Sequence, residues 1–207
     1  AGGGAVVDLT CGVGTLLLAA ARAWPGAVPP RLVGRDVDRK AISECKQTFA
    51  TMGLDSSSIR SGDGRWLGDD LAPGGAEAVL CDLPCGDRFR EGARPQIYDG
   101  LLEEAARVLR PGGRCVLLST RREMLAQAVA KGPWRLVVAW PVGRGNGGFK
   151  ESQLVALERL ASTNESVDKD EALAPAATEA VPQPTPAEML GPSPSQALRD
   201  KWRALGL

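Results

Sequence analysis

Short apolar runs alternate with longer amphipathic stretches over the first 160 residues of the chain. The short runs are rich in Val, Leu and Ala and end close to Asp, Gly or Pro, which is typical of buried strands. The stretches between them repeat apolar positions at helical spacing. The pattern predicts strands in residues 5–9, 31–38, 57–67 (a short strand and a turn), 76–84, 114–120, 134–143 and 152–160, and helices in residues 16–24, 39–52, 96–113 and 122–131.

This alternation predicts a doubly wound, Rossmann-like α/β fold with a mostly parallel sheet. The ligand crevice of such a sheet lies at the carboxyl ends of its strands, near the point where the strand order reverses. The last two predicted strands are joined by the Gly-rich segment "RGNGGF" without a helix, so they should pair antiparallel. The expected fold is a seven-stranded sheet with an antiparallel last strand.

Residues 161–207 differ in composition from everything before them. They are rich in Pro, Ala, Ser and acids and show no apolar periodicity, which predicts a disordered tail behind a domain of residues 1–160. The chain begins Ala-Gly-Gly-Gly without a methionine and enters a strand almost at once, so we expect a further N-terminal part in the natural protein.

Charge and residue content restrict the chemistry. Lys plus Arg and Asp plus Glu number 25 each, whereas a protein that grips nucleic acid alone through its phosphates usually has a basic excess. The absence of histidine excludes histidine triads, bases and metal ligands. Five cysteines, with no signal peptide and no apolar run of membrane length, indicate a reducing intracellular compartment, cytoplasmic or nuclear.

The turn after the first predicted strand is rich in glycine. In "VVDLTCGVGTL", Asp8 ends the strand and Gly12 and Gly14 precede a helix, and glycine lets the backbone approach a ligand closely. Leu17 replaces the third glycine of the NAD and FAD motif, and an acid at the strand end suits the cationic amino group of a methionyl moiety. The turn therefore favours S-adenosylmethionine, with an ordinary strand-to-helix turn as the alternative. The expected cofactor residues of this turn are Asp8, Cys11, Gly12, Gly14 and Thr15.

Acids also end the next two predicted strands. Asp36 lies where an acid accepts hydrogen bonds from ribose hydroxyls, and Asp38 either does the same or, as we prefer, caps the next helix. Asp63 suits an adenine amino group and Gly64 would let the ring approach, although a plain Asp-Gly turn is the alternative. Together with the glycine turn, these acids predict an adenosine-bearing cofactor across the crevice.

The segment "VLCDLPCGDRF" raises a choice between metal and acid chemistry. Cys81 and Cys85 flank Asp82, but structural zinc needs four ligands, usually paired Cys and His. The chain has no histidine, and its other cysteines fall in different predicted elements. We therefore expect no metal site, a buried thiol at Cys81, and Asp82 at the crevice.

"DLTCGVGTL", "GRDVD" and "DLPCGDRF" together resemble the THUMP-domain-containing, UPF0020-like RNA methyltransferases that methylate guanine N2. "VLRPGGRCVLLST" and the two last strands extend the resemblance over about residues 5–160. After the fourth strand the family has Asp, then Pro or Leu, then Pro, an aromatic and Gly. The matching residues are Asp82, Leu83, Pro84 and Gly86, whereas Cys85 stands in place of the aromatic.

The resemblance implies a class I methyltransferase fold, S-adenosylmethionine as cofactor, and a catalytic segment of Asp82, Leu83, Pro84 and Cys85. The exocyclic guanine amine is a poor nucleophile because its lone pair is delocalised into the ring. A carboxylate at Asp82 and a backbone carbonyl of Leu83 or Pro84 would accept its protons and hold the nitrogen in line with the methyl group. Arg88 and Arg90 would then reach RNA phosphates, unless they form a solvated basic loop.

The implied reaction is methyl transfer to guanosine N2 in RNA, with tRNA as the expected substrate class. The implied partners are an N-terminal THUMP module that binds the RNA and, in eukaryotic members, a small zinc-binding activating subunit. Two alternatives remain: a methyltransferase for another amine in rRNA, snRNA or protein, and an inactive cofactor-binding scaffold, which Cys85 suggests. A nicotinamide-dependent oxidoreductase is disfavoured, because the chain lacks a catalytic histidine, a Tyr–Lys pair and the third glycine.

Overall fold

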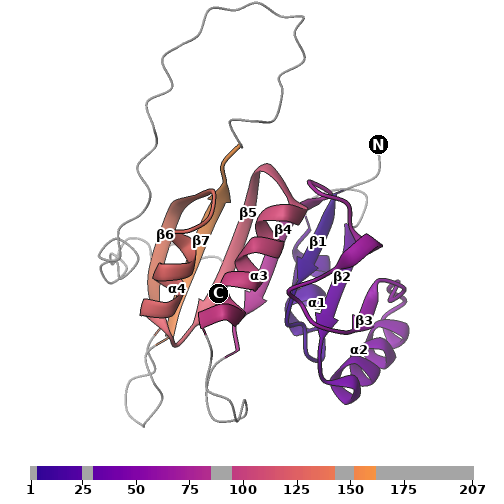
Figure 1. Ribbon diagram of the computed structural model, residues 1–207. Coiled ribbons are helices and arrows are strands. Elements are labelled where there is room, and N and C mark those ends of the chain that lie inside the picture. The colour runs from indigo at the N-terminus through magenta and orange to yellow at the C-terminus, as the bar shows by residue number, and fades with distance from the viewer. Residues whose placement is uncertain (1–3, 25–29, 85–94, 143–151, 162–207) are drawn as a thin grey trace, which may run out of the picture.

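The computed structural model describes residues 4–24, 30–84, 95–142 and 152–161. These residues form one seven-stranded sheet with helices packed against it (Figure 1). In chain order the elements are β1 (Ala5–Asp8), α1 (Thr15–Ala23), β2 (Arg31–Asp36), α2 (Arg39–Thr51), β3 (Ile59–Ser61), a 3₁₀ turn η1 (Gly68–Asp70), β4 (Ala76–Asp82), α3 (Pro95–Val108), β5 (Leu109–Ser119), α4 (Arg122–Val129), β6 (Trp134–Val142) and β7 (Ser152–Arg159).

The strand order is β3-β2-β1-β4-β5-β7-β6. The pairs from β3 to β5 are parallel, and β7 runs antiparallel to both β5 and β6. The predicted fold class, a mostly parallel seven-stranded sheet with an antiparallel last strand, is confirmed. The chain order reverses between β1 and β4, so the ends of these two strands mark the expected ligand crevice.

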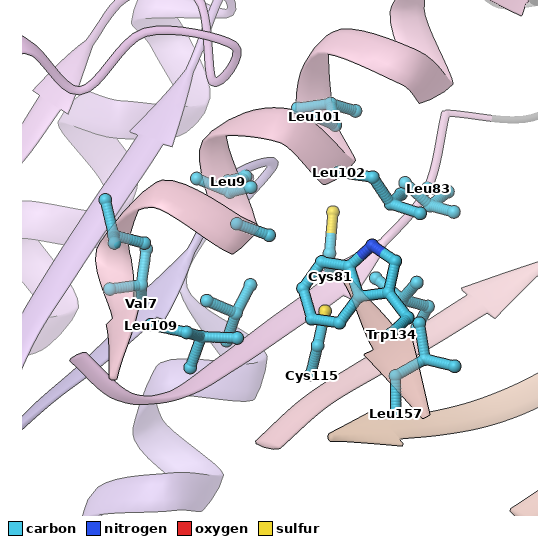
Figure 2. Packing of buried hydrophobic residues seen from close by; sticks show 14 of the residues in the cluster. Val7, Leu9, Cys81, Leu83, Leu101, Leu102, Leu109, Cys115, Trp134 and Leu157 are labelled. Carbon is cyan, nitrogen blue, oxygen red and sulfur yellow. The ribbon is translucent and has the colours of Figure 1, made fainter. Parts of the chain in front are cut away.

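The core is divided into two layers by the sheet. All four residues of β1 are buried, as expected for a parallel strand covered on both faces. Val6 packs with Leu17 and Phe49 of α1 and α2, while Val7 belongs to the layer under α3 and α4. Figure 2 shows Cys81 in this second layer, near Cys115 and Trp134. The prediction that Cys81 is a buried thiol is therefore confirmed.

One element boundary differs from the prediction. The sequence predicts a helix over residues 96–113, but α3 ends at Val108 and Leu109 already pairs with Ala76 of β4. The ladder then shifts register before Ala78, with Gly112 at a φ of 74° in the intervening bend. Pro111 and Gly112 therefore bend the start of a strand and do not end a helix.

Several predicted features lie outside the described residues. They are the tail from residue 162 onward, most of the segment between β6 and β7, and the residues after Pro84 up to Pro95. Among the described helices, none is long and apolar enough to cross a membrane.

Candidate active site

A cleft of about 420 Å³ lies at the carboxyl ends of the strands on both sides of the switch point. The turns after β1, β2, β3 and β4 line it, and α3 closes one side. Its lining residues are Leu9, Thr10, Asp36, Val37, Asp63, Gly64, Arg65, Asp82, Leu83, Pro84, Ile97 and Leu101. The predicted acids Asp36, Asp63 and Asp82, from three separate turns, are thus brought together at one cleft.

The glycine turn stands beside this cleft rather than in its lining. Gly12 and Gly14 have φ values of 50° and 87°, in the left-handed region that favours glycine. A Cβ on Gly14 would lie 2.5 Å from the Cys45 Sγ, so α1 and α2 pack too closely for any other residue. Leu17, which replaces the third glycine, is fully buried between the sheet and α2.

Two further predicted residues of this turn, Cys11 and Thr15, lie outside the lining of the cleft. Cys11 is buried in the layer with α1 and α2, and burial raises the pKa of its thiol, so it is neutral at physiological pH. Thr15 is the first residue of α1. Neither lines the cleft, so any contact of theirs with a cofactor would run along the edge of the turn.

Asp36 ties the glycine turn to the second strand. Its Oδ2 accepts a hydrogen bond of 2.8 Å from the Gly12 N–H, and its Oδ1 accepts one of 2.9 Å from the Asp38 N–H. Asp38 in turn caps α2 by accepting from the backbone N–H groups of Lys40 and Ala41. The preferred role of Asp38 as the helix cap is confirmed, and Asp36 lines the cleft, where its preferred role in binding the ligand stays a prediction.

Asp63 is already paired with a neighbour. Its carboxylate accepts from the Arg65 guanidinium, with an Nη2–Oδ2 distance of 2.6 Å, and from the Arg65 N–H at 2.9 Å. These hydrogen bonds hold the pKa of Asp63 below its usual range. A Cβ on Gly64 would lie 1.9 Å from the Leu9 carbonyl oxygen, so the turns after β1 and β3 touch through backbone at this point.

Asp8 is a buried carboxyl at the end of β1 and is not among the residues that line the cleft. It is 1% exposed, and burial raises its pKa to about 7, although Oδ1 accepts a 3.0 Å hydrogen bond from the Thr10 N–H. The neighbouring acids Asp36 and Asp82 raise the pKa further. A cation bound beside Asp8 would favour the charged form of its carboxyl.

Asp82 ends β4 with its side chain exposed to the cleft, and partial burial raises its pKa. The Thr10 hydroxyl donates a 2.9 Å hydrogen bond to the Asp82 carbonyl and lies 3.0 Å from the Cys81 Sγ. The next residue, Leu83, is anchored by its N–H, which donates to the Leu118 carbonyl at 2.9 Å. The turn that carries Asp82 is therefore held to both β1 and β5.

Sequence reasoning did not single out Thr10, Val37, Arg65, Ile97 or Leu101 as lining residues of the cleft. The sequence does contain a signal for Val37, because an apolar residue between two acids, Asp36 and Asp38, is unusual. In the structure the Val37 side chain is 65% exposed. The α3 residues carried no such signal, since their spacing is that of any core helix.

The remaining predicted residues, Cys85, Arg88 and Arg90, lie outside the described part of the chain. Their suggested roles stay predictions. Within the described residues, no group of three or more His, Cys, Asp or Glu side chains is arranged to hold a metal ion.

The sheet order and the cleft over the switch point define a Rossmann-like methyltransferase domain. A family model described as "UPF0020: RMKL-like, methyltransferase domain" matches residues 2–147, and the chain belongs to this family. This agrees with the resemblance found in the motifs and with S-adenosylmethionine as the cofactor.

Individual relatives agree with this membership. Over 116 residues the chain is 33% identical to the U6 snRNA (guanine-N(2))-methyltransferase THUMPD2 of Bos taurus, covering 56% of this chain and 22% of the relative. It is 34% identical over 119 residues to the ribosomal RNA small subunit methyltransferase C of Pseudomonas aeruginosa (strain LESB58), covering 56% and 32%. The crystal structure of TrmN from Thermus thermophilus superposes with a TM-score of 0.61 at 28% identity, covering 77% of this chain and 45% of that one. The chain thus spans about a third or less of the length of these two curated relatives.

Proposed function

We propose that this domain transfers a methyl group from S-adenosylmethionine to the N2 amine of a guanosine in RNA, with tRNA as the first substrate class to test. The observation that carries the proposal is the position of Asp82. Its carboxylate faces the cleft from a turn fixed on two sides, with a raised pKa that suits proton transfer. The acids of the other turns occupy the same cleft.

S-adenosylmethionine supplies an electrophilic methyl group on a sulfonium centre. In this proposal Asp8 stabilises its cationic amino group, because a positive charge beside a buried carboxyl offsets the burial. Asp36 has spare lone pairs on both oxygens for ribose hydroxyls, since each already accepts only one backbone N–H. Val37 and the bare backbone of Gly64 offer faces against which an adenine ring can pack.

Asp82 and the carbonyls after it act on the amine. A carboxylate that accepts an N–H from the amine points the nitrogen lone pair at the methyl carbon and accepts the proton as the new N–C bond forms. In the in-line transfer the electron pair of the breaking C–S bond stays on sulfur, so the proton on nitrogen is the only group left for the protein to receive. The raised pKa of Asp82 makes it a stronger acceptor for that proton.

The net charge of the chain and its family resemblance support a proposal about the partners that bind the RNA and activate the domain. The net charge of zero provides no general attraction to phosphates, so RNA affinity would come from an N-terminal THUMP module, as the resemblance implies. We further propose that a small zinc-binding subunit pairs with an edge strand. In the described sheet β3 and β6 are the edges, and an edge offers unpaired backbone groups to a partner strand.

Cys85 favours a second candidate. An aromatic ring at this position would stack on the target base, and base stacking on aromatic residues contributes about 1–3 kcal/mol per base. Cysteine lacks that planar face, so the second candidate is a methyltransferase for another amine in rRNA, snRNA or protein, or a scaffold that binds the cofactor without transfer.

Calorimetry with S-adenosylmethionine and with NAD, followed by methyl transfer to tRNA, U6 snRNA and rRNA, separates these candidates. The proposal predicts that the domain binds S-adenosylmethionine but not NAD, and that N2-methylguanosine forms in tRNA. Modification only in the other RNAs, or at another atom, selects the second methyltransferase candidate. Methyl transfer to protein alone also selects the second methyltransferase candidate. Cofactor binding with no transfer to any RNA or protein, when the RNA-binding module and the subunit are supplied, selects the scaffold, and binding of NAD alone overturns all of these candidates.

A further inference from the structure

The catalytic turn receives a third hydrogen bond, from inside the core. The Tyr98 hydroxyl donates to the Pro84 carbonyl at 3.4 Å, and it lies 2.8 Å from the Ser119 Oγ. Tyr98 is the one tyrosine of the sequence and is fully buried in α3, while Ser119 ends β5 and is 1% exposed. Helix α3 also lines the cleft, through Ile97 and Leu101 on either side of Tyr98.

The protons of this cluster define a direction. Either oxygen can be the donor in the 2.8 Å contact between the Tyr98 and Ser119 hydroxyls, while Ser119 Oγ also accepts from the Arg121 N–H at 2.9 Å. Tyr98 has one proton, so when it donates to the Pro84 carbonyl, the Ser119 proton goes to the Tyr98 oxygen. The result is a chain of donors that starts at the N-terminus of α4, passes through two buried hydroxyls and ends on the turn after Asp82.

The sequence of the turn explains why such a chain is needed. The Asp82 carbonyl accepts from Thr10 and the Leu83 N–H donates to Leu118, so both residues are held to neighbouring elements by hydrogen bonds. Pro84 has no N–H, and its carbonyl is the only backbone group by which it can be hydrogen-bonded. A buried tyrosine needs a partner for its hydroxyl, but Ser119 alone would meet that need.

We propose that Tyr98, acting with Ser119, is a positioning residue that fixes the Leu83–Pro84 peptide and so sets the direction in which the turn presents Asp82 and its acceptor carbonyls to the substrate amine. This inference rests on the proposed methyl transfer. It makes Tyr98 a positioning residue and not a catalytic one, because its proposed action on the substrate passes through the Pro84 carbonyl. A displacement of about 1 Å at reacting groups can reduce a rate about 100-fold, so a weak hydrogen bond at this point is enough to matter.

Tyr98→Phe removes the hydroxyl and keeps the ring, and Ser119→Ala removes the preceding donor. With the RNA-binding module and the subunit supplied, and with the RNA that the preceding assay shows to be methylated, we expect each variant to lower kcat by about 10- to 100-fold while the Kd for S-adenosylmethionine stays within about twofold of wild type. The double variant should lose no more than the worse single variant, because both act through one chain of hydrogen bonds.

Ser58→Ala is the matched control. Ser58 is also a buried serine whose Oγ accepts side-chain hydrogen bonds, from Arg31 at 3.0 and 3.2 Å, but it lies before β3, away from the cleft. It should lower the melting temperature about as much as Ser119→Ala and leave kcat unchanged. If Tyr98→Phe retains wild-type kcat, or loses kcat only in proportion to a loss of folded protein, the positioning role is wrong.

A readout without RNA separates this inference from the function on which it rests. Selective ¹³C labelling of the proline carbonyls reports the hydrogen bond to Pro84 directly. We expect Tyr98→Phe and Ser119→Ala to move the Pro84 carbonyl resonance and Ser58→Ala to leave it in place. An unmoved resonance overturns the inference even if methyl transfer is shown, and absence of transfer by wild type overturns the proposed function even if the resonance moves.

Discussion

Asp8 and Asp82 show how a turn at a strand end changes a carboxyl group. Both have a raised pKa because burial disfavours the charged form, but Asp8 is enclosed while Asp82 faces the cleft. The enclosed group is suited to stabilising a fixed cation, and the accessible one is suited to exchanging a proton. The same residue type thus serves two proposed roles through its surroundings.

The burial of Asp8 makes folding stability depend on pH. Its pKa is about 7 in the folded chain against 3.8 when unperturbed, so between these values the folded state holds a proton that the unfolded state has released. The free energy of unfolding therefore decreases as the pH rises from about 4 to 7. Asp8→Asn keeps an acceptor for the Thr10 N–H and removes the charge. We predict that the free energy of unfolding of Asp8→Asn, minus that of wild type, is larger at pH 8 than at pH 4.5 by roughly 2–4 kcal/mol.

Urea unfolding without cofactor at several pH values measures this difference. Asp55→Asn is the control of opposite sign, because hydrogen bonds from Ser57 lower the pKa of Asp55. A stability difference between Asp8→Asn and wild type that does not change with pH contradicts the buried charge.

Gly64 and Gly62 differ in the space around them although they share one turn. A Cβ on Gly64 would lie 1.9 Å from the Leu9 carbonyl oxygen, whereas one on Gly62 would lie 3.5 Å from the nearest atom, in the Arg35 side chain. We predict that Gly64→Ala lowers the free energy of unfolding by about 1–3 kcal/mol and weakens S-adenosylmethionine binding, because the turns after β1 and β3 must separate. Gly62→Ala should change the free energy by less than about 0.5 kcal/mol. Thermal unfolding measures the stability of both variants, and calorimetry measures their affinity for S-adenosylmethionine. Equal effects of the two substitutions would contradict the close approach of Gly64 to the Leu9 carbonyl.

At the scale of elements, β7 carries an unusual buried residue. Gln153 is fully buried opposite Ser119, and neither of its amide atoms has a hydrogen-bond partner among the residues that the structure describes. A buried polar group left unsatisfied costs about 1–3 kcal/mol. Gln153→Met keeps the approximate shape without the amide, so we predict that the free energy of unfolding increases by about 1 kcal/mol or more.

Chemical unfolding of Gln153→Met and of Gln47→Met, on the exposed face of α2, tests this point. The exposed substitution should have little effect. A clear loss of stability in Gln153→Met would show that the amide is hydrogen-bonded in solution.

The sequence predicted the elements and the acids of the cleft but not the contacts between turns. Strand ends were predictable because apolar runs stop at Asp8, Asp36 and Asp82, and parallel strands bring such ends to one edge. The bonds from Thr10 to Asp82 and from Tyr98 to Pro84 depend on tertiary packing, and no periodicity marks them. The α3–β5 boundary was misplaced because Pro-Gly-Gly ends helices more often than it bends strands.

At the scale of the molecule, the described residues form a seven-stranded sheet with a cleft at its switch point, and the whole chain has a net charge of zero. The chain spans 22% of THUMPD2 and 32% of methyltransferase C, and in the proposed function RNA affinity and activation come from other parts of the protein and from a partner. The domain itself would supply methyl-donor binding and the geometry of transfer.

The most direct test of this account is mass spectrometry of RNA nucleosides after incubation with S-adenosylmethionine, the RNA-binding module, the subunit and either wild type, Asp82→Asn or Glu123→Gln. Glu123 is exposed in the first turn of α4, outside the cleft, and serves as the control. The account predicts N2-methylguanosine with wild type and Glu123→Gln. With Asp82→Asn it predicts a rate lower by at least about 100-fold, at unchanged cofactor affinity. Equal N2-methylguanosine with Asp82→Asn, or a methyl group on a different atom, would contradict it.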